Sequence, residues 1–206
     1  MKLKSFLAAA IFSLTPALHA ETSREDVASG LYSLDKTHAF LTWTVKHNNI
    51  SDYSVNFTDF DAILEFDADN PANSKIELTI NPMGLETKYP DASKKADWEN
   101  KLATDDSFFD ATQYPEISFV STDIQVDGDT VGRVTGDLSF RGMQQRVTMD
   151  VSYGGVANPP WFGQRDVIGF NASTSLDRSD FGMTNLRGIV SDQVIIEFSG
   201  EFIQDE

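Results

Sequence analysis

Histidine is the residue type in this chain best suited to proton transfer or metal binding near neutral pH. The sequence holds three, His19, His38 and His47, and it has no cysteine. His38 and His47 are nine residues apart, an odd number, so on one regular strand their side chains would point to opposite faces. Without thiolates a metal would depend on carboxylates, and the aspartates are scattered over hydrophilic segments. We therefore predict no metal site.

The sequence also lacks the short patterns that are typical of catalytic or nucleotide-binding sites. It contains no G-x-S-x-G elbow, H-E-x-x-H pair, Walker loop or G-x-G-x-x-G fingerprint. Acid pairs such as Asp105 with Asp106, or Asp59 with Asp61, lie on hydrophilic segments, where such pairs usually serve solubility. We predict no catalytic residues and no enzyme. The alternative is an enzyme that acts on a bound lipid with His47 as its acid or base.

Three side chains are candidates for contact with the polar head group of a ligand. They are His47, Arg141 and Arg178. Arginine presents a planar fork of donors that suits carboxylate or phosphate, and both arginines adjoin glycine- or aspartate-rich turns near predicted strand ends. In so acidic a chain, pairing with local carboxylates is the alternative for each arginine. For His47 the alternative is a backbone carbonyl or a water at the end of its strand.

The elements that must position these residues are β-strands, because from Leu31 onward apolar residues alternate with polar ones. The alternation is clear within residues 41–45, 60–66, 76–80 and 147–153. Further strands are predicted at 117–126, 131–140, 166–176 and 190–203. His47 has the parity of the apolar face of its strand. We expect the apolar faces to supply an interior lining of Leu41, Trp43, Val45, Phe60, Leu64, Phe66, Leu78, Phe119, Leu138, Phe140, Met149, Phe170, Ile196 and Phe198.

Eight half-buried strands predict an all-β fold, and short turns favour antiparallel pairing. Asp127-Gly128-Asp129 and Arg141-Gly142 are turn signals between consecutive strands. Closure into an eight-stranded antiparallel barrel satisfies every strand edge, whereas a sandwich leaves edges to protect. The interior of such a barrel either fills with side chains or holds one small ligand. The 15 phenylalanines leave both outcomes open, the filled one being a protein-interaction module.

One segment departs from the alternation and predicts a short helix at 91–103. It is rich in helix formers and places Trp98 and Leu102 four residues apart on one face, with Asp91 or Ser93 as the N-cap. We expect the helix to lie against the barrel or across its mouth. The alternative is a connecting helix that packs its tryptophan outside.

The N-terminus and the charge indicate an exported chain. Lys2 and Lys4 precede an apolar run that ends in small residues before Glu21, the order of a secretory signal peptide. We predict a signal peptide at 1–20, an N-terminal arm at 21–30 and one domain at 31–206, with no membrane-spanning segment after cleavage. The net charge of −16 argues against nucleic acid as a partner.

Several segments of the chain resemble the YceI-like polyisoprenoid-binding proteins, and together they extend from about Tyr32 to Phe202. The segments are Tyr32-Ser33-Leu34-Asp35 with His38, Trp43-Thr44-Val45-Lys46-His47, Phe108-Phe109-Asp110, Tyr114-Pro115-Glu116-Ile117-Ser118-Phe119, Ser121-Thr122, Gly136-Asp137-Leu138-Ser139-Phe140-Arg141-Gly142, Asp177-Arg178-Ser179-Asp180-Phe181-Gly182 and Val190-Ser191-Asp192. They occur in the family's order, and Trp43 stands where phenylalanine is usual.

The resemblance implies a lipocalin-like barrel of eight antiparallel strands in the bacterial periplasm. It also implies an amphiphilic lipid partner, with the isoprenoid tail of a quinone precursor or of a polyprenyl phosphate inside the barrel. Members are often dimeric, so a homodimer is an expected arrangement. No cofactor is expected beyond such a bound polyisoprenoid or quinone-like lipid.

Overall fold

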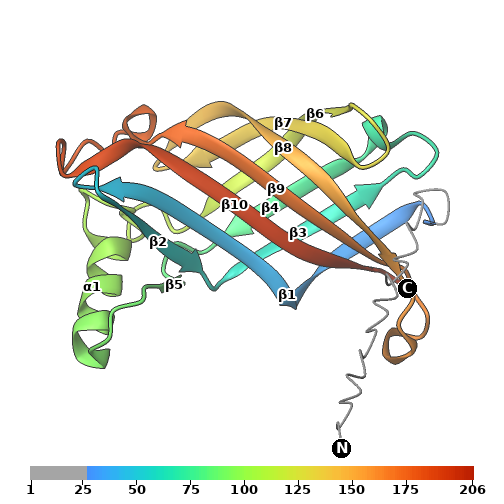
Figure 1. The fold of residues 1–206 in the computed structure, drawn as a ribbon, viewed down its shortest axis with the longest axis horizontal. Helices are drawn as coiled ribbons and strands as arrows, with labels where there is room; N and C mark the ends of the chain where they lie inside the picture. Colours follow the sequence, from blue (N-terminus) through green and yellow to red (C-terminus); the bar gives the residue numbers. More distant parts are fainter. Residues whose placement is uncertain (1–26) are drawn as a thin grey trace, which may run out of the picture.

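The structure is a computed structural model that describes residues 27–206. The predicted signal peptide, and residues 21–26 of the predicted arm, lie outside the described residues. The described chain forms an antiparallel barrel of eight strands in the order β10-β9-β8-β7-β6-β4-β3-β1, closed by pairing of β1 with β10 (Figure 1). The predicted all-β barrel is confirmed.

The strands and helices follow one another along the chain with short connections. The strands are β1 (Gly30–His47), β2 (Ser51–Phe57), β3 (Phe60–Phe66), β4 (Lys75–Ile80), β5 (Leu85–Glu86), β6 (Ile117–Val126), β7 (Val131–Phe140), β8 (Met143–Ala157), β9 (Val167–Asp177) and β10 (Val190–Gln204). The α-helix is α1 (Ala92–Thr104), and the short 3-10 helices are η2 (Pro71–Asn73), η3 (Pro160–Phe162) and η4 (Arg178–Phe181).

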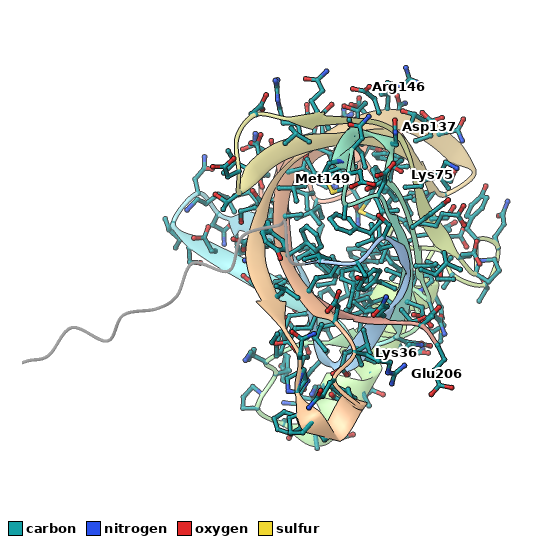
Figure 2. The ribbon with its side chains drawn as sticks, turned by 90° about the vertical axis from the view of Figure 1, so that its right-hand side faces the viewer. Lys36, Lys75, Asp137, Arg146, Met149 and Glu206 are labelled. Atoms are coloured by element: carbon teal, nitrogen blue, oxygen red, sulfur yellow. The ribbon has the colours of Figure 1, made fainter. Side chains whose placement is uncertain are left out.

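The alternation of the sequence corresponds to an interior and an exterior face of the barrel wall. Along β3 every second residue is buried, from Phe60 to Phe66, and the residues between them are exposed. Figure 2 looks into the barrel from the right-hand side of Figure 1, and in it Met149 points inward whereas Lys75 and Arg146 point outward. The apolar faces therefore meet inside the barrel, where their burial stabilises the fold.

The alternation changes phase within β1. Tyr32 and Leu34 are buried before the change, and Leu41 and Trp43 after it, so the buried positions pass from even to odd numbers. The pairing of β1 with β10 shifts register between Leu34 and Ala39, which marks a bulge. Before this bulge β1 also pairs with β3, and beyond it β1 pairs with β2. The bulge is thus the point at which the strand passes from one end of the barrel to the other.

Two strands were not among the predicted ones, and both lie at one end of the barrel. β2 pairs with β1 from Leu41 to His47 and on its other side with β5. β5 has only two residues and pairs with no further strand. The continuous ladder of strands therefore stops at β5 on this side, and other elements must complete the wall.

Helix α1 lies at that same end (Figure 1). It begins after Asp91, whose side chain accepts a hydrogen bond from the Lys94 amide at 2.9 Å, as expected of an N-cap. Trp98 faces the barrel: its Nε1 donates to the Tyr53 hydroxyl at 2.8 Å, and its ring meets Phe108 edge to face. The helix thus packs its tryptophan inward. No helix in the described chain has the length and apolar character needed to cross a membrane.

Candidate functional site: the barrel interior

The barrel encloses an apolar cavity in two parts. The wide chamber, of about 510 Å³, lies at the α1 end and is lined by Trp43, Tyr53, Trp98 and Phe140 among others. The narrow chamber, of about 190 Å³, lies toward the β6–β7 turn and is lined by residues that include Leu64, Phe66 and Phe170. The two chambers share five lining residues, which are Leu41, Leu78, Phe119, Met149 and Ile196. The wide chamber alone falls within the ~300–1,000 Å³ typical of small-molecule sites, so the interior is not filled by the protein's own side chains.

The structure places every predicted lining residue except Phe60 in the wall of this cavity. Eight of the others line a single chamber, four in each, and the shared five line both. The wide chamber has Trp43, Val45, Leu138 and Phe140, and the narrow chamber has Leu64, Phe66, Phe170 and Phe198. Phe60 is buried but packs edge to face against Phe198, with ring centroids 6.5 Å apart. Phe60 therefore packs against a lining residue without reaching the cavity itself.

The lining also holds residues that sequence reasoning did not place there, and several of them come from β2 and from the segment around α1. They include Tyr53 of β2, Trp98 of α1, and Phe108 and Phe109 of the loop that follows α1. Tyr53, Val55 and Phe57 alternate with polar residues, a signal that would have revealed β2. The inward direction of Phe108 and Phe109 had no such signal, because their loop is irregular.

Arg178 lies in the wall of the wide chamber and is almost completely buried. Its Nε donates to the Ser191 carbonyl at 2.9 Å, and its Nη1 donates to the Met183 carbonyl at 2.9 Å and to Asn185 Oδ1 at 3.1 Å. Burial lowers the pKa of the guanidinium from its ordinary value, and the nearby Asp192 opposes that shift. Arg178 therefore fastens the β9–β10 loop around the chamber mouth.

Arg141 lies outside the cavity lining, and its donors are taken up by backbone carbonyls. It adopts a φ of 51° in the β7–β8 turn, and its guanidinium donates to the carbonyls of Asp106, Phe108 and Phe181. Two of these carbonyls belong to the loop that walls the wide chamber. Arg141 thus positions the wall, and its contacts with backbone carbonyls leave it in no contact with the chamber.

His47 lies at the mouth of the wide chamber, where it lines the opening and is exposed to solvent. Its Nδ1 is 3.2 Å from Nδ2 of the Asn48 side chain. Of the three predicted head-group candidates, the structure brings His47 and Arg178 to the same chamber and leaves Arg141 behind its wall.

Trp43 brings an unpartnered polar group into the wide chamber wall. Its side chain is 9% exposed, and its Nε1 has no hydrogen-bond acceptor among the described residues. The ring packs against Tyr53 and Phe109, with centroids 6.2 and 5.8 Å apart. Because buried N–H groups almost always have a partner, this one is a candidate for a ligand oxygen.

The mouth of the narrow chamber is acidic by comparison. Asp129 and Arg133 line it, and Arg133 pairs with Asp127 at 3.1 Å. Because Arg133 is paired, it offers no unpaired positive charge at this mouth. Deeper in, the wall is made of aliphatic and aromatic side chains.

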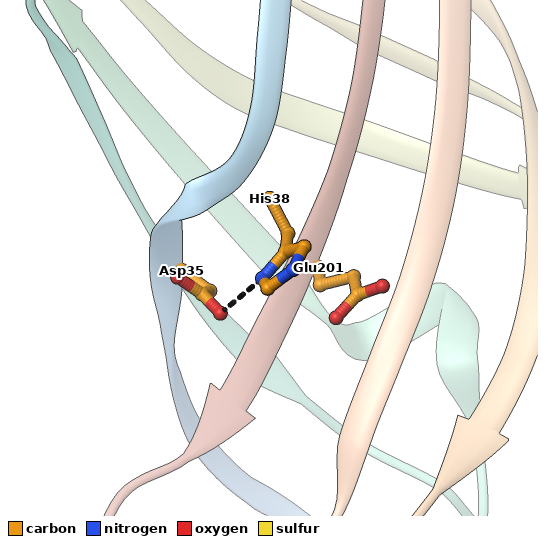
Figure 3. Close-up of side chains that lie close together, drawn as sticks. All are labelled: Asp35, His38 and Glu201. Carbon is orange, nitrogen blue, oxygen red and sulfur yellow. Dashed lines mark hydrogen bonds and ion pairs between the residues drawn. The ribbon is translucent and has the colours of Figure 1, made fainter.

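Outside the cavity, Asp35, His38 and Glu201 form the one group of three potential metal ligands in the described part of the chain (Figure 3). His38 Nδ1 is 2.9 Å from Asp35 Oδ2, and Thr37 donates to the other oxygen of Asp35 through its amide and its hydroxyl. Asp35 is buried, whereas His38 and Glu201 are exposed. The contacts close the β1 bulge. His38 is absent from the lining of both chambers, whereas His47 lines the mouth of the wide one, so the two histidines lie on opposite faces, as their odd spacing predicts.

The protonation of this pair follows from the same contacts. The hydrogen bond that His38 donates to Asp35 raises the pKa of His38 above its ordinary value. Burial alone would raise the pKa of Asp35, but hydrogen bonds from Thr37 and His38 outweigh it and hold that pKa below its ordinary value. The Asp35–His38 bond is therefore strongest when the carboxyl is ionised and the imidazole is protonated.

Comparisons with known proteins agree with this architecture. A family model described as the YceI-like domain matches residues 32–202. The protein YceI of Shigella flexneri is 33% identical over 177 residues, which are 85% of this chain and 87% of that protein.

Solved structures show the same fold. The YCEI protein of Campylobacter jejuni superposes with a TM-score of 0.67 at 29% identity, covering 78% of this chain and 90% of that one. A polyisoprenoid binding domain from Saccharophagus degradans, described as implicated in plant cell wall breakdown, gives a TM-score of 0.62 at 15% identity. It covers 84% of this chain and 98% of that chain, and at this identity it supports the fold alone.

Proposed function

Because the chain belongs to the YceI-like domain family, we propose that it binds a long polyisoprenoid or a similar amphiphilic lipid along the two chambers. The observation that carries this proposal is the joined, apolar cavity with shared lining at Leu41, Phe119 and Met149. An apolar tunnel gains affinity with each methylene it buries, at ~0.8 kcal/mol per CH2 before the tail is ordered. The protein binds its lipid and performs no reaction on it.

The polarity of the chambers gives the bound lipid a direction. In this proposal the end of the tail lies in the narrow chamber, and the head group lies in the wide chamber. The wide chamber offers two donors, the Nε1 group of Trp43 and the hydroxyl of Tyr53, and the positive charge of Arg178 lies in its wall. The Tyr53 hydroxyl accepts from Trp98, so its own hydrogen is directed elsewhere and can meet a ligand oxygen. A quinone carbonyl or a phosphate oxygen suits these donors.

The proposal includes export to the periplasm through cleavage of residues 1–20. The sequence order of Lys2, Lys4 and the apolar run before Glu21 supports it. Fractionation of a producing bacterium, with N-terminal sequencing, should yield a periplasmic protein that begins at Glu21. A full-length protein in the cytoplasm would contradict this part.

Native mass spectrometry of protein purified without detergent tests the binding proposal. We expect a mass shift that corresponds to one lipid per chain, and an organic extract of the same sample should contain a lipid with a long apolar tail. Addition of an octaprenyl lipid to extracted protein should restore the shift. Protein that is purified empty and also refuses the added lipid would overturn the proposal.

A further inference from the structure

Exposed apolar side chains border the mouth of the wide chamber. Ile50 in the β1–β2 turn is 84% exposed, and Leu186 and Ile189 in the β9–β10 loop are 41% and 45% exposed. The Asn48 amide donates to the Ile189 carbonyl at 2.6 Å, so the two loops lie side by side. Both loops are at the α1 end of the barrel (Figure 1). We call Ile50, Leu186 and Ile189 the apolar rim.

The apolar rim is held in place by its backbone and by buried contacts. Leu186 itself lines the mouth and has a φ of 52°, a value that leucine rarely adopts. Its carbonyl accepts hydrogen bonds from the amides of Ile189 and Val190, both at 3.0 Å. Arg178 holds the same loop from inside. The loop therefore holds Leu186 in a defined position, and the side chain is exposed because of this backbone conformation and not because the loop is disordered.

The charges around the rim differ from those of the molecule as a whole. Arg187 lies between Leu186 and Ile189, and its side chain makes no ion pair with any other described residue. Lys46, beside the mouth, is neutralised by Asp52 at 2.7 Å. At the narrow mouth, in contrast, Arg133 is paired with Asp127, and Asp129 lies in the same lining. The rim therefore combines apolar tips with Arg187, whose charge acts on Asp192 from beyond ion-pair distance, in a chain whose net charge is −16.

We propose that the apolar rim docks the barrel on the surface of a lipid bilayer, so that a lipid passes between the membrane and the wide chamber without crossing water. The inference rests on the proposed function, because the rim surrounds the opening through which the lipid would move. Apolar side chains can enter the boundary between head groups and acyl chains, and Arg187 can reach a lipid phosphate. The net negative charge opposes tight binding to an anionic surface, so the docking is reversible.

Flotation with phospholipid vesicles tests the docking. Vesicles of phosphatidylcholine, and of phosphatidylethanolamine with a minority of phosphatidylglycerol, are mixed with the purified protein. We expect the double variant Ile50→Ser with Ile189→Ser to reduce the bound fraction about tenfold, and Arg187→Gln to reduce it about twofold. Added salt should strengthen binding to the anionic vesicles, because it screens the repulsion by the acidic barrel.

The matched control is Trp161→Ser in the β8–β9 loop. Trp161 is 77% exposed, lies in η3 and is absent from the lining of both chambers. We expect this variant to bind vesicles as the unchanged protein does. The docking proposal is overturned if the unchanged protein does not float, if the rim variant still floats, or if Trp161→Ser abolishes flotation.

Two further measurements separate the possible failures. Native mass spectrometry of the rim variant should show the lipid still bound, since Ile50 and Ile189 do not line the cavity. Unchanged protein that floats with vesicles but never carries a lipid would contradict the proposed function and leave the docking standing. Sedimentation velocity should show the same mass for the rim variant and the unchanged protein. A dimer that dissociates in the rim variant would make the rim an interface between two copies and overturn the docking.

Discussion

The two ends of the barrel are built in different ways. Around the narrow chamber most of the wall is a ladder of paired strands, from β3 and β4 through β6 to β9, with register shifts only within β6 and β8. Around the wide chamber the ladder stops at β5, and α1 with the loop at Phe108 and Phe109 completes the wall. Loops leave carbonyls that no strand can satisfy.

Two arginines, the buried Arg178 and the half-buried Arg141, supply the missing donors at the wide end. Arg141 bonds to three carbonyls behind the chamber wall, and Arg178 bonds to the β9–β10 loop at the chamber mouth. At the narrow end the comparable arginine, Arg133, forms an exposed ion pair with Asp127. Arginine therefore has two roles in this protein. At the wide end it donates to backbone carbonyls and holds loops in place, and at the narrow end it is a solvated charge in an ion pair.

Substitution of these arginines should give the largest effect and tests the comparison directly. Arg178→Met leaves the Met183 and Ser191 carbonyls without their donor, so we expect a loss of about 3 kcal/mol in the free energy of unfolding. Arg133→Met removes an exposed pair and should cost less than about 1 kcal/mol. Urea unfolding followed by circular dichroism measures both. Equal losses for the two variants would show that the wide end does not depend on buried donors.

A second substitution distinguishes the chambers by the length of lipid that each one holds. Ala62 is buried on β3 and lines the narrow chamber, whereas its neighbour Ile63 points outward. Ala62→Phe should fill the narrow chamber and lower the affinity for an octaprenyl lipid about tenfold or more, because several methylenes lose their burial. A farnesyl lipid, which the wide chamber can hold, should bind with little change. Fluorescence titration of both lipids makes the measurement.

Ile63→Phe is the matched control for this variant, since it adds a similar ring on the exterior face of the same strand. It should leave both affinities unchanged. If Ala62→Phe weakens the short and the long lipid equally, the direction proposed for the bound lipid is wrong. Circular dichroism of both variants guards against a loss of affinity through misfolding.

The interior of the barrel was predictable because alternation is a local property of the sequence. Residues such as Leu41, Phe119 and Met149 could be assigned to the lining from parity alone. The turn at Arg141-Gly142 and the helix after Asp91 also follow from local signals, which are the glycine, at a positive φ in the structure, and the N-cap aspartate. These features needed no knowledge of distant contacts.

The construction of the wide end was not predictable in the same way. The contacts of Arg178 span up to thirteen residues and those of Arg141 up to forty, so no local pattern reveals that each bonds to carbonyls. Phe60 has the right parity for the lining, yet it packs against Phe198, because parity gives the side of the wall and not the depth within it. The bulge at Asp35 changes which positions along β1 face the interior. It follows from the pairing of β1 with β3 before the bulge and with β2 beyond it, and these pairings are not visible in the sequence of β1 alone.

The bulge between the two ends should make a smaller and pH-dependent contribution to stability. The pKa of His38 is raised in the folded protein by its bond to Asp35. Its stabilising effect is therefore fully present below the unfolded pKa of histidine, about 6.5, and is lost as the pH rises through the folded value. The pKa of Asp35 is lowered, so its contribution is present above its unfolded pKa and fades as the pH falls through the folded one.

An NMR titration of the His38 imidazole should show the raised pKa. Asp35→Asn should return the His38 pKa toward its ordinary value, and the control His47→Ala, outside the bulge, should leave the His38 pKa unchanged. If the His38 pKa stays raised in Asp35→Asn, the cause of the raised pKa is Glu201 and not Asp35. The bulge would then be held by a contact with β10 and not by a contact within β1.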